Sequence, residues 1–133
     1  LPWMQELPLP ASSAIWSVPV EIDLKTANSI GVVDGDRVRV ESSQGAIEAP
    51  AFVNPAAIPG VLSMAIGAGH ANYTRFGTGL GSNPLSILAS SVEATTGAIA
   101  TGATRVKISR VSDEGGLIQF STHKRENKPH SER

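Results

Sequence analysis

The chain has 133 residues, of which 41% are hydrophobic and 17% charged, and its formal net charge is −1. This length is enough for one globular domain with a sizeable core and too short for a second. The near-zero charge argues against nucleic-acid binding, which needs a basic surface. The absence of cysteine excludes disulfides, thiolate metal sites and a cysteine nucleophile.

The two ends of the chain differ in composition from its middle. The opening LPWMQELPLP contains three prolines and predicts an extended conformation rather than a helix. Residues 121–133 are polar and charged, so we expect a disordered tail or linker after a folded domain over residues 1–120. No window has the ~18 apolar residues of a membrane span, and we expect no direct membrane insertion. Because the chain opens on Leu1, we expect a processed product or an excised piece of a longer protein.

The first predicted elements are a strand and a short helix. Residues 14–22 are mostly apolar and predict a strand, which Pro19 places at an edge or at a bulge. Asp23 is suited to cap a helix, and apolar residues follow it at near-helical spacing up to Gly31. Glycine favours the left-handed conformation that ends helices, so we predict a two-turn helix over residues 23–30.

The clearest strand signal lies over residues 36–42. After the turn residues Asp34-Gly35-Asp36, Val38 and Val40 alternate with charged residues, which predicts a strand with one buried face. The two aspartates resemble a catalytic carboxylate pair. Their position in a tight turn is a sufficient structural reason for them.

Further short elements follow along the chain. Residues 46–53 predict a strand that Pro50 places at an edge or bulge, and residues 61–66 predict a fully buried strand. Residues 83–88 predict a short helix, residues 103–111 an alternating strand and residues 117–120 one more strand. Short strands with two small helices predict an all-β barrel or sandwich rather than alternating βαβ units.

Five glycines occur among the sixteen residues 67–82. Successive glycines let the backbone approach a ligand closely and direct several amides at an anion such as pyrophosphate. His70, Tyr73 and Arg75 in the same segment add an imidazole, a stackable ring and a cation. The segment predicts a nucleotide-binding loop, and its length favours function. A flexible surface loop is the alternative that composition leaves open.

Signals for catalysis are weak elsewhere in the chain. A Ser/His/Asp triad is rejected because no G-x-S-x-G nucleophile turn is present. His123 and His130 lie in the charged tail, where we expect exposed side chains rather than metal ligands. We therefore predict no catalytic residue and no metal ligand in this chain.

Several motifs, in their order along the chain, resemble the C-terminal domain of the molybdopterin oxidoreductases. The similarity is greatest to the polysulfide-reductase-like branch and to large subunits of quinone-linked membrane complexes, and it covers about residues 1–110. The motifs are PWMQELP at 2–8, VEID at 20–23, GVVDGDRVRVES at 31–42, GAIEAPAFV at 45–53 and AIGAGHANYTRFGTGLGSNPL at 65–85.

This resemblance implies a six-stranded double-psi β-barrel that forms one side of a pocket for molybdopterin guanine dinucleotide. Six residues are implied by their positions to bind this cofactor: Gly67, Gly69, His70, Tyr73, Arg75 and Asn83. Gly67, Gly69 and His70 would lie against the dinucleotide phosphates or the pterin. Tyr73 and Arg75 would flank that contact, and Asn83 would form a hydrogen bond with the guanosine or the pterin.

The resemblance also implies that the domain is inactive in isolation, because the molybdenum ligand and iron–sulfur cysteines of the family lie in other domains. The implied partners are the other domains of the same large subunit, an iron–sulfur subunit and a membrane subunit that reacts with quinone. The implied location is a periplasmic or membrane-associated complex, with a cytoplasmic one left open. Two alternatives remain: a structural barrel domain of a quinone-linked respiratory complex that has lost molybdenum, and a free-standing double-psi barrel that acts as an interaction module.

Overall fold

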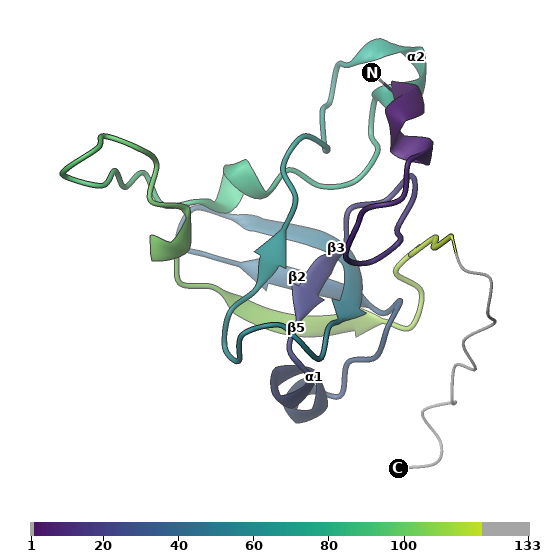
Figure 1. Ribbon diagram of the computed structural model, residues 1–133, viewed down its shortest axis with the longest axis horizontal. Coiled ribbons are helices and arrows are strands. Elements are labelled where there is room, and N and C mark those ends of the chain that lie inside the picture. Colours follow the sequence, from purple (N-terminus) through teal and green to yellow (C-terminus); the bar gives the residue numbers. More distant parts are fainter. Residues whose placement is uncertain (1, 121–133) are drawn as a thin grey trace.

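The computed structural model describes residues 2–120 and contains one five-stranded sheet with short helices around it (Figure 1). The strands are β1 (Val20–Ile22), β2 (Arg37–Glu41), β3 (Ala46–Val53), β4 (Ser63–Met64) and β5 (Lys107–Ser112). The α-helices are α1 (Leu24–Ile30) and α2 (Thr74–Gly77), and the 3₁₀ helices are η1 (Pro2–Glu6), η2 (Pro84–Ile87) and η3 (Thr101–Ala103). The predicted tail, residues 121–133, lies outside the described residues.

The sheet is open, with the strand order β4-β1-β3-β2-β5. β1 and β3 are parallel, and the other three neighbouring pairs are antiparallel. The prediction of a β-rich fold with short helices is confirmed. The six-stranded closed barrel is not confirmed, because the described chain forms five strands and its two edge strands, β4 and β5, are not paired with each other.

Helix α1 forms where the sequence predicts it. The Asp23 carboxylate accepts hydrogen bonds from the backbone N–H groups of Lys25 and Thr26 at 2.9 and 3.1 Å, which satisfies amides that have no partner inside the helix. Gly31 ends the helix in the left-handed conformation, with φ of 68°. Ala27 is the buried residue of this helix and packs against the sheet.

The turn before β2 is held by both of its aspartates. Asp34 Oδ1 accepts the backbone N–H of Val53 at 2.6 Å, and Asp36 Oδ2 accepts the backbone N–H of Val33 at 3.0 Å. Asp36 also accepts from Arg110 Nε of β5 at 2.8 Å, and this contact raises the pKa of the Arg110 guanidinium. The structural interpretation of the two carboxylates is therefore supported: they join the turn to β3 and β5.

The sequence places Pro50 at an edge or at a bulge, and the edge position is wrong, because β3 is the central strand of the sheet. Residues 46–50 of β3 pair with β2, and residues 51–53 pair with β1. Pro50 is thus the residue at which β3 exchanges one neighbour for the other. Proline has no backbone N–H group to donate. It is tolerated at this position because Ala49 before it pairs with β2 and Ala51 after it pairs with β1.

Three other segments have a different secondary structure from the one that the sequence predicts. The opening residues form η1 rather than an extended segment. The first strand is limited to β1, because Ser13 and Trp16 adopt positive φ angles of 53° and 52° that break extended structure. Of residues 117–120, only Gln119 forms a β-bridge, with Ala14.

The sequence predicts a buried strand over residues 61–66, and the structure shows this segment to be mostly exposed. Its strand, β4, has two residues, and Val61 and Ile66 are 50% and 66% exposed. Its apolar run therefore does not reflect burial within the described residues. No helix among residues 2–120 is long and apolar enough to cross a membrane.

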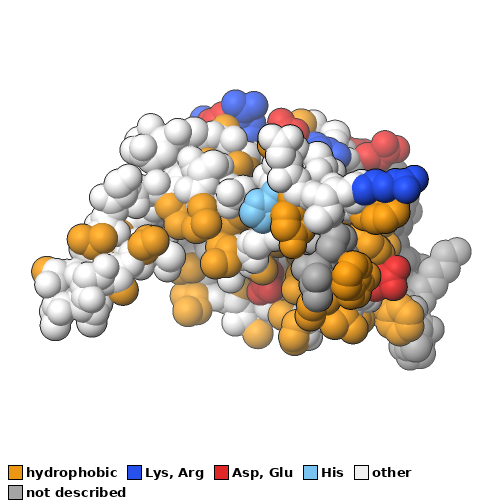
Figure 2. All heavy atoms as spheres, turned by 90° about the horizontal axis from the view of Figure 1, so that it is seen from above, with side chains coloured by type: hydrophobic (Ala, Val, Ile, Leu, Met, Phe, Trp, Pro, Cys, Tyr) orange, Lys and Arg blue, Asp and Glu red, His pale blue; other side chains and the backbone are white. Residues whose placement is uncertain are grey.

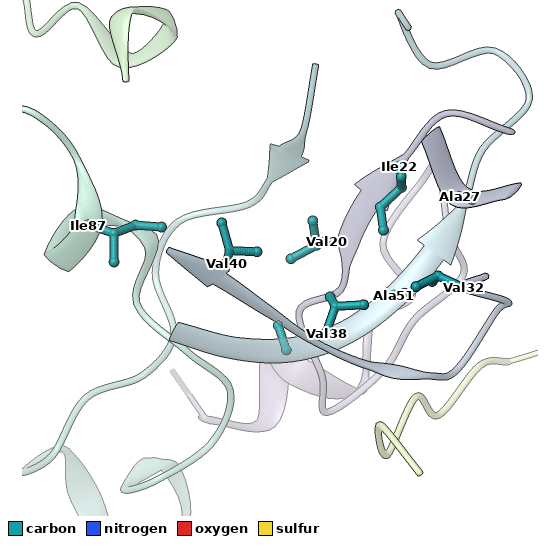
Figure 3. Packing of buried hydrophobic residues seen from close by; sticks show 9 residues of the cluster. Val20, Ile22, Ala27, Val32, Val38, Val40, Ala51 and Ile87 are labelled. Atoms are coloured by element: carbon teal, nitrogen blue, oxygen red, sulfur yellow. The ribbon is translucent and has the colours of Figure 1, made fainter. Parts of the chain in front are cut away.

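The core lies on the inner face of the curved sheet (Figure 3). The alternation in β2 is confirmed, since Val38 and Val40 are buried while Arg39 between them is exposed. The remaining members come from β1, β3, α1, η2 and the segment after α1: Val20, Ile22, Ala27, Val32, Ala49, Ala51 and Ile87. Ile87 belongs to η2, so this core fixes the end of the glycine-rich segment against the sheet.

Candidate functional site

The glycine-rich segment forms a loop whose two limbs run side by side at its base. Gly69 N donates to Leu80 O at 2.8 Å, and Gly79 N donates to His70 O at 3.0 Å. The limbs are so close that a Cβ atom at Gly69 would lie 2.3 Å from the backbone nitrogen of Asn83. Only glycine fits this position, which also has a φ of 76°.

The tip of the loop is a compact turn that contains α2. Thr78 Oγ1 accepts the backbone N–H of Tyr73 at 3.0 Å and donates to Thr74 O at 2.8 Å. Gly77 is buried against Tyr73, since a Cβ at Gly77 would lie 2.6 Å from the Cδ1 atom of that ring. α2 packs against η1, and the two helices lie together at one end of the molecule (Figure 1).

Two pairs of side chains lie at the surface of this loop. The rings of His70 and Tyr73 have centroids 5.0 Å apart and are tilted by 38°. The Arg75 guanidinium lies 5.2 Å from the centroid of the Phe76 ring, a cation–π contact. Figure 2 looks onto this end of the molecule and shows the imidazole at the surface beside hydrophobic side chains. Within residues 2–120, Arg75 forms no ion pair.

The base of the loop is fixed to the sheet and to η2. Asn83 Oδ1 accepts the backbone N–H of Leu85 at 3.1 Å and caps η2, so the helix predicted over residues 83–88 is present as a 3₁₀ helix. The Ser82 hydroxyl donates to Glu48 O of β3. The Ser42 hydroxyl donates to Ile87 O at 2.6 Å. These contacts hold the C-terminal end of the loop against the sheet and η2.

The structure therefore brings four of the six predicted site residues together in two pairs. Gly69 lies against Asn83 at the base, and His70 lies against Tyr73 at the surface. Arg75 contacts Phe76 at the tip, and Gly67 begins the loop with a φ of 111° and open space around its Cβ position. The binding roles of these residues stay predictions.

Two residues that shape this loop were not predicted. Thr78 closes the tip through its hydroxyl, and Phe76 supplies the ring beneath the Arg75 guanidinium. A threonine in a turn between glycines is a sequence signal for a hydroxyl that bonds nearby backbone. Which backbone groups it reaches depends on the folded loop.

The loop offers donors and rings rather than metal ligands. Residues 2–120 contain no cluster of three or more His, Cys, Asp or Glu side chains that is able to hold a metal ion. Backbone amides, an imidazole and a guanidinium are groups that bind anions, and the aromatic rings are able to stack on a planar ligand. The chemistry available here is binding of an anionic, ring-containing molecule.

The family model described as "Molydopterin dinucleotide binding domain" matches residues 5–105. Among solved structures, the chain is similar to acetylene hydratase from Pelobacter acetylenicus, with a TM-score of 0.56 and 18% sequence identity. That similarity covers 71% of this chain and 14% of the other, so this chain spans a small part of the length of that enzyme. The search of curated proteins found no match. Because the family model covers most of the chain, the chain belongs to the family of molybdopterin dinucleotide-binding domains.

Proposed function

We propose that this chain is the cofactor-binding domain of a molybdopterin-dependent oxidoreductase and that residues 67–83 form one wall of a pocket for molybdopterin guanine dinucleotide. Family membership supports the cofactor class. The observation that carries the role of the loop is its base, where Gly69 lies against Asn83. This contact fixes the backbone of the loop, and the same segment carries an imidazole, an aromatic ring and a guanidinium at the surface.

The groups present in the loop fit such a cofactor. Arg75 is exposed and forms no ion pair within residues 2–120, so its donors are available to the phosphates. His70 and Tyr73 offer ring faces for a pterin or a guanine. Asn83 uses its Oδ1 for the helix cap, and its amide nitrogen remains as a donor to a ring carbonyl.

In this proposal the chain binds and orients the cofactor, and the bound cofactor supplies redox chemistry at its metal. The domain would act within a larger subunit whose other domains complete the pocket. The small share of acetylene hydratase that the chain matches supports such an arrangement. An iron–sulfur subunit and a membrane subunit that reacts with quinone are the further proposed partners.

The test compares two variants of the parent polypeptide. Arg75→Ala removes a charge-assisted contact to phosphate worth about 1.5–3 kcal/mol, so it should lower cofactor retention with little change in melting temperature. Asn83→Ala removes a helix cap and should cost about 1 kcal/mol of stability. Guanine nucleotide released by acid from each purified variant, together with its melting temperature, provides the measurement.

Arg105→Ala is the matched control, because Arg105 is also an exposed arginine and lies outside the loop. It should retain the nucleotide content of the unmodified protein. If Arg75→Ala retains a full complement of nucleotide while Asn83→Ala only melts earlier, the loop is a structural element and the proposed pocket is wrong.

A further inference from the structure

The inner side of the open sheet forms a groove of about 1190 Å³ that shares no residue with the glycine-rich loop. Each of the five strands contributes to its lining, and so does η2. Figure 3 shows Val20, Val40 and Ile87 pointing toward this common space. The strand residues that line it are Val20, Val40, Ile47, Ser63, Met64 and Ile108. The floor of the groove is therefore the apolar core itself.

Both edge strands of the sheet border this groove. β4 contributes Met64 and β5 contributes Ile108, and within residues 2–120 each of these strands pairs with one neighbour only. The outer side of an edge strand presents backbone N–H and C=O groups that can pair with another extended chain. β5 has six residues, a length of about 20 Å at ~3.3 Å per residue.

The lip of the groove carries positive charge. Arg105 is the one charged residue among the described residues that line the groove. Its side chain is exposed and forms no ion pair within residues 2–120. Lys107, the first residue of β5, does not line the groove and lies opposite Glu41 of β2 in the sheet. A ligand in the groove therefore meets one cation, Arg105, and no carboxylate from the lining.

We propose that this groove binds an extended peptide segment with apolar side chains on one face and acidic side chains on the other, added as a strand beside β5. The apolar side chains would lie on the groove floor, the backbone would pair with the free strand edge, and the carboxylates would face Arg105. Pockets for small molecules measure roughly 300–1,000 Å³ and need no strand edges. A larger groove bordered by two strand edges favours an extended peptide.

The test is a fluorescence anisotropy titration of the 133-residue chain into labelled eight-residue peptides with blocked ends. The first peptide alternates Val and Glu, the second alternates Val and Lys, and the third is the Val-Glu peptide with N-methylated backbone amides. We expect the first peptide to bind at least about tenfold more tightly than either of the others, because they lose the charge match or the backbone pairing.

Arg105→Glu should reverse the order of the first two peptides, because it inverts the charge at the lip without altering the groove floor. Lys25→Glu is the control: it reverses an exposed positive charge at a residue that does not line the groove and should leave all three affinities unchanged. A titration with dodecanoate tests an anionic amphiphile as the other occupant.

Three results would overturn the proposal. One is no binding of the Val-Glu peptide up to millimolar concentration. The second is equal binding of the N-methylated peptide, which would show that the strand edge is not used. The third is saturable binding of dodecanoate without binding of any peptide, which would assign the groove to amphiphiles. None of these results depends on the cofactor loop, so this proposal and the proposed function can fail separately.

Discussion

Gly69 lies directly against Asn83: a Cβ atom at residue 69 would fall 2.3 Å from the backbone nitrogen of Asn83 and 2.5 Å from the backbone carbonyl carbon of Ser82. Both neighbouring atoms belong to the backbone and cannot move aside by a change of rotamer. Asn83 also caps η2, and Ile87 of η2 belongs to the core. The beginning of the loop is therefore connected through Asn83 to the packing of the sheet.

Gly69→Ala should destabilise the chain by more than about 1 kcal/mol, because alanine combines a strained positive φ with a collision against backbone. Gly67→Ala is the matched control, since it also has positive φ but has open space at its Cβ position. Urea denaturation of both variants measures the difference. Equal free energies of unfolding would show that the contact with Asn83 has no energetic role.

Asp36→Asn should lower the free energy of unfolding by about 1–3 kcal/mol. Oδ2 of the buried carboxylate accepts hydrogen bonds from Val33 N and Arg110 Nε, and asparagine removes the negative charge that pairs with the Arg110 guanidinium. Asp113→Asn is the control, because the Asp113 side chain is 69% exposed and also pairs with Arg110. Its effect should stay below about 1 kcal/mol. Thermal denaturation of the two variants compares them, and equal losses would contradict the role of Asp36.

Stability should fall as the pH drops below about 4, with a contribution from Asp23. Hydrogen bonding by the Thr26 side chain, then by the backbone amides of Thr26, Gly60 and Lys25, holds the pKa of Asp23 below its usual range despite burial of the group. A carboxylate with a lower pKa in the folded state stabilises the fold above its unfolded pKa and loses that effect as the pH falls through its folded pKa.

Asp23→Asn isolates this contribution, because asparagine also caps helices but does not titrate. Its free energy of unfolding should depend less steeply on pH below about 4 than that of the unmodified chain. Urea denaturation at several acidic pH values measures both slopes. Identical slopes would show that Asp23 does not contribute to the loss of stability at acidic pH.

Thr78→Val should open the tip of the glycine-rich loop. The hydroxyl of Thr78 accepts from Tyr73 N and donates to Thr74 O, and valine keeps the shape of threonine without either hydrogen bond. We expect faster hydrogen exchange of the Tyr73 amide with little change in melting temperature, because the tip lies outside the core. Thr78→Ser retains the hydroxyl and should retain the slow exchange. Equal exchange in both variants would show that the hydroxyl does not close the tip.

Several elements could be predicted from the sequence because their signals are local. Asp23 and Gly31 lie within one helical turn of the ends of α1, and cap and left-handed preferences act at that range. The alternation of Val38 and Val40 with charged residues also predicts the buried face of β2 from local sequence, because successive side chains of a strand point to opposite faces. In the candidate site, the Asn83-Pro84 pair predicted a short helix from local cap chemistry, and it is present as η2.

The order and closure of the sheet were decided by the tertiary structure alone. Pro50 indicates an edge or a bulge because proline lacks an N–H group, yet it lies in the central strand, at the point where β3 changes neighbours. The apolar run over residues 61–66 is equally consistent with burial in a closed barrel and with the wall of an open groove. The choice of strand partners, and the contact of Gly69 with Asn83, depend on segments that are separated along the chain. Side-chain periodicity within one segment carries no information about which other segment packs beside it.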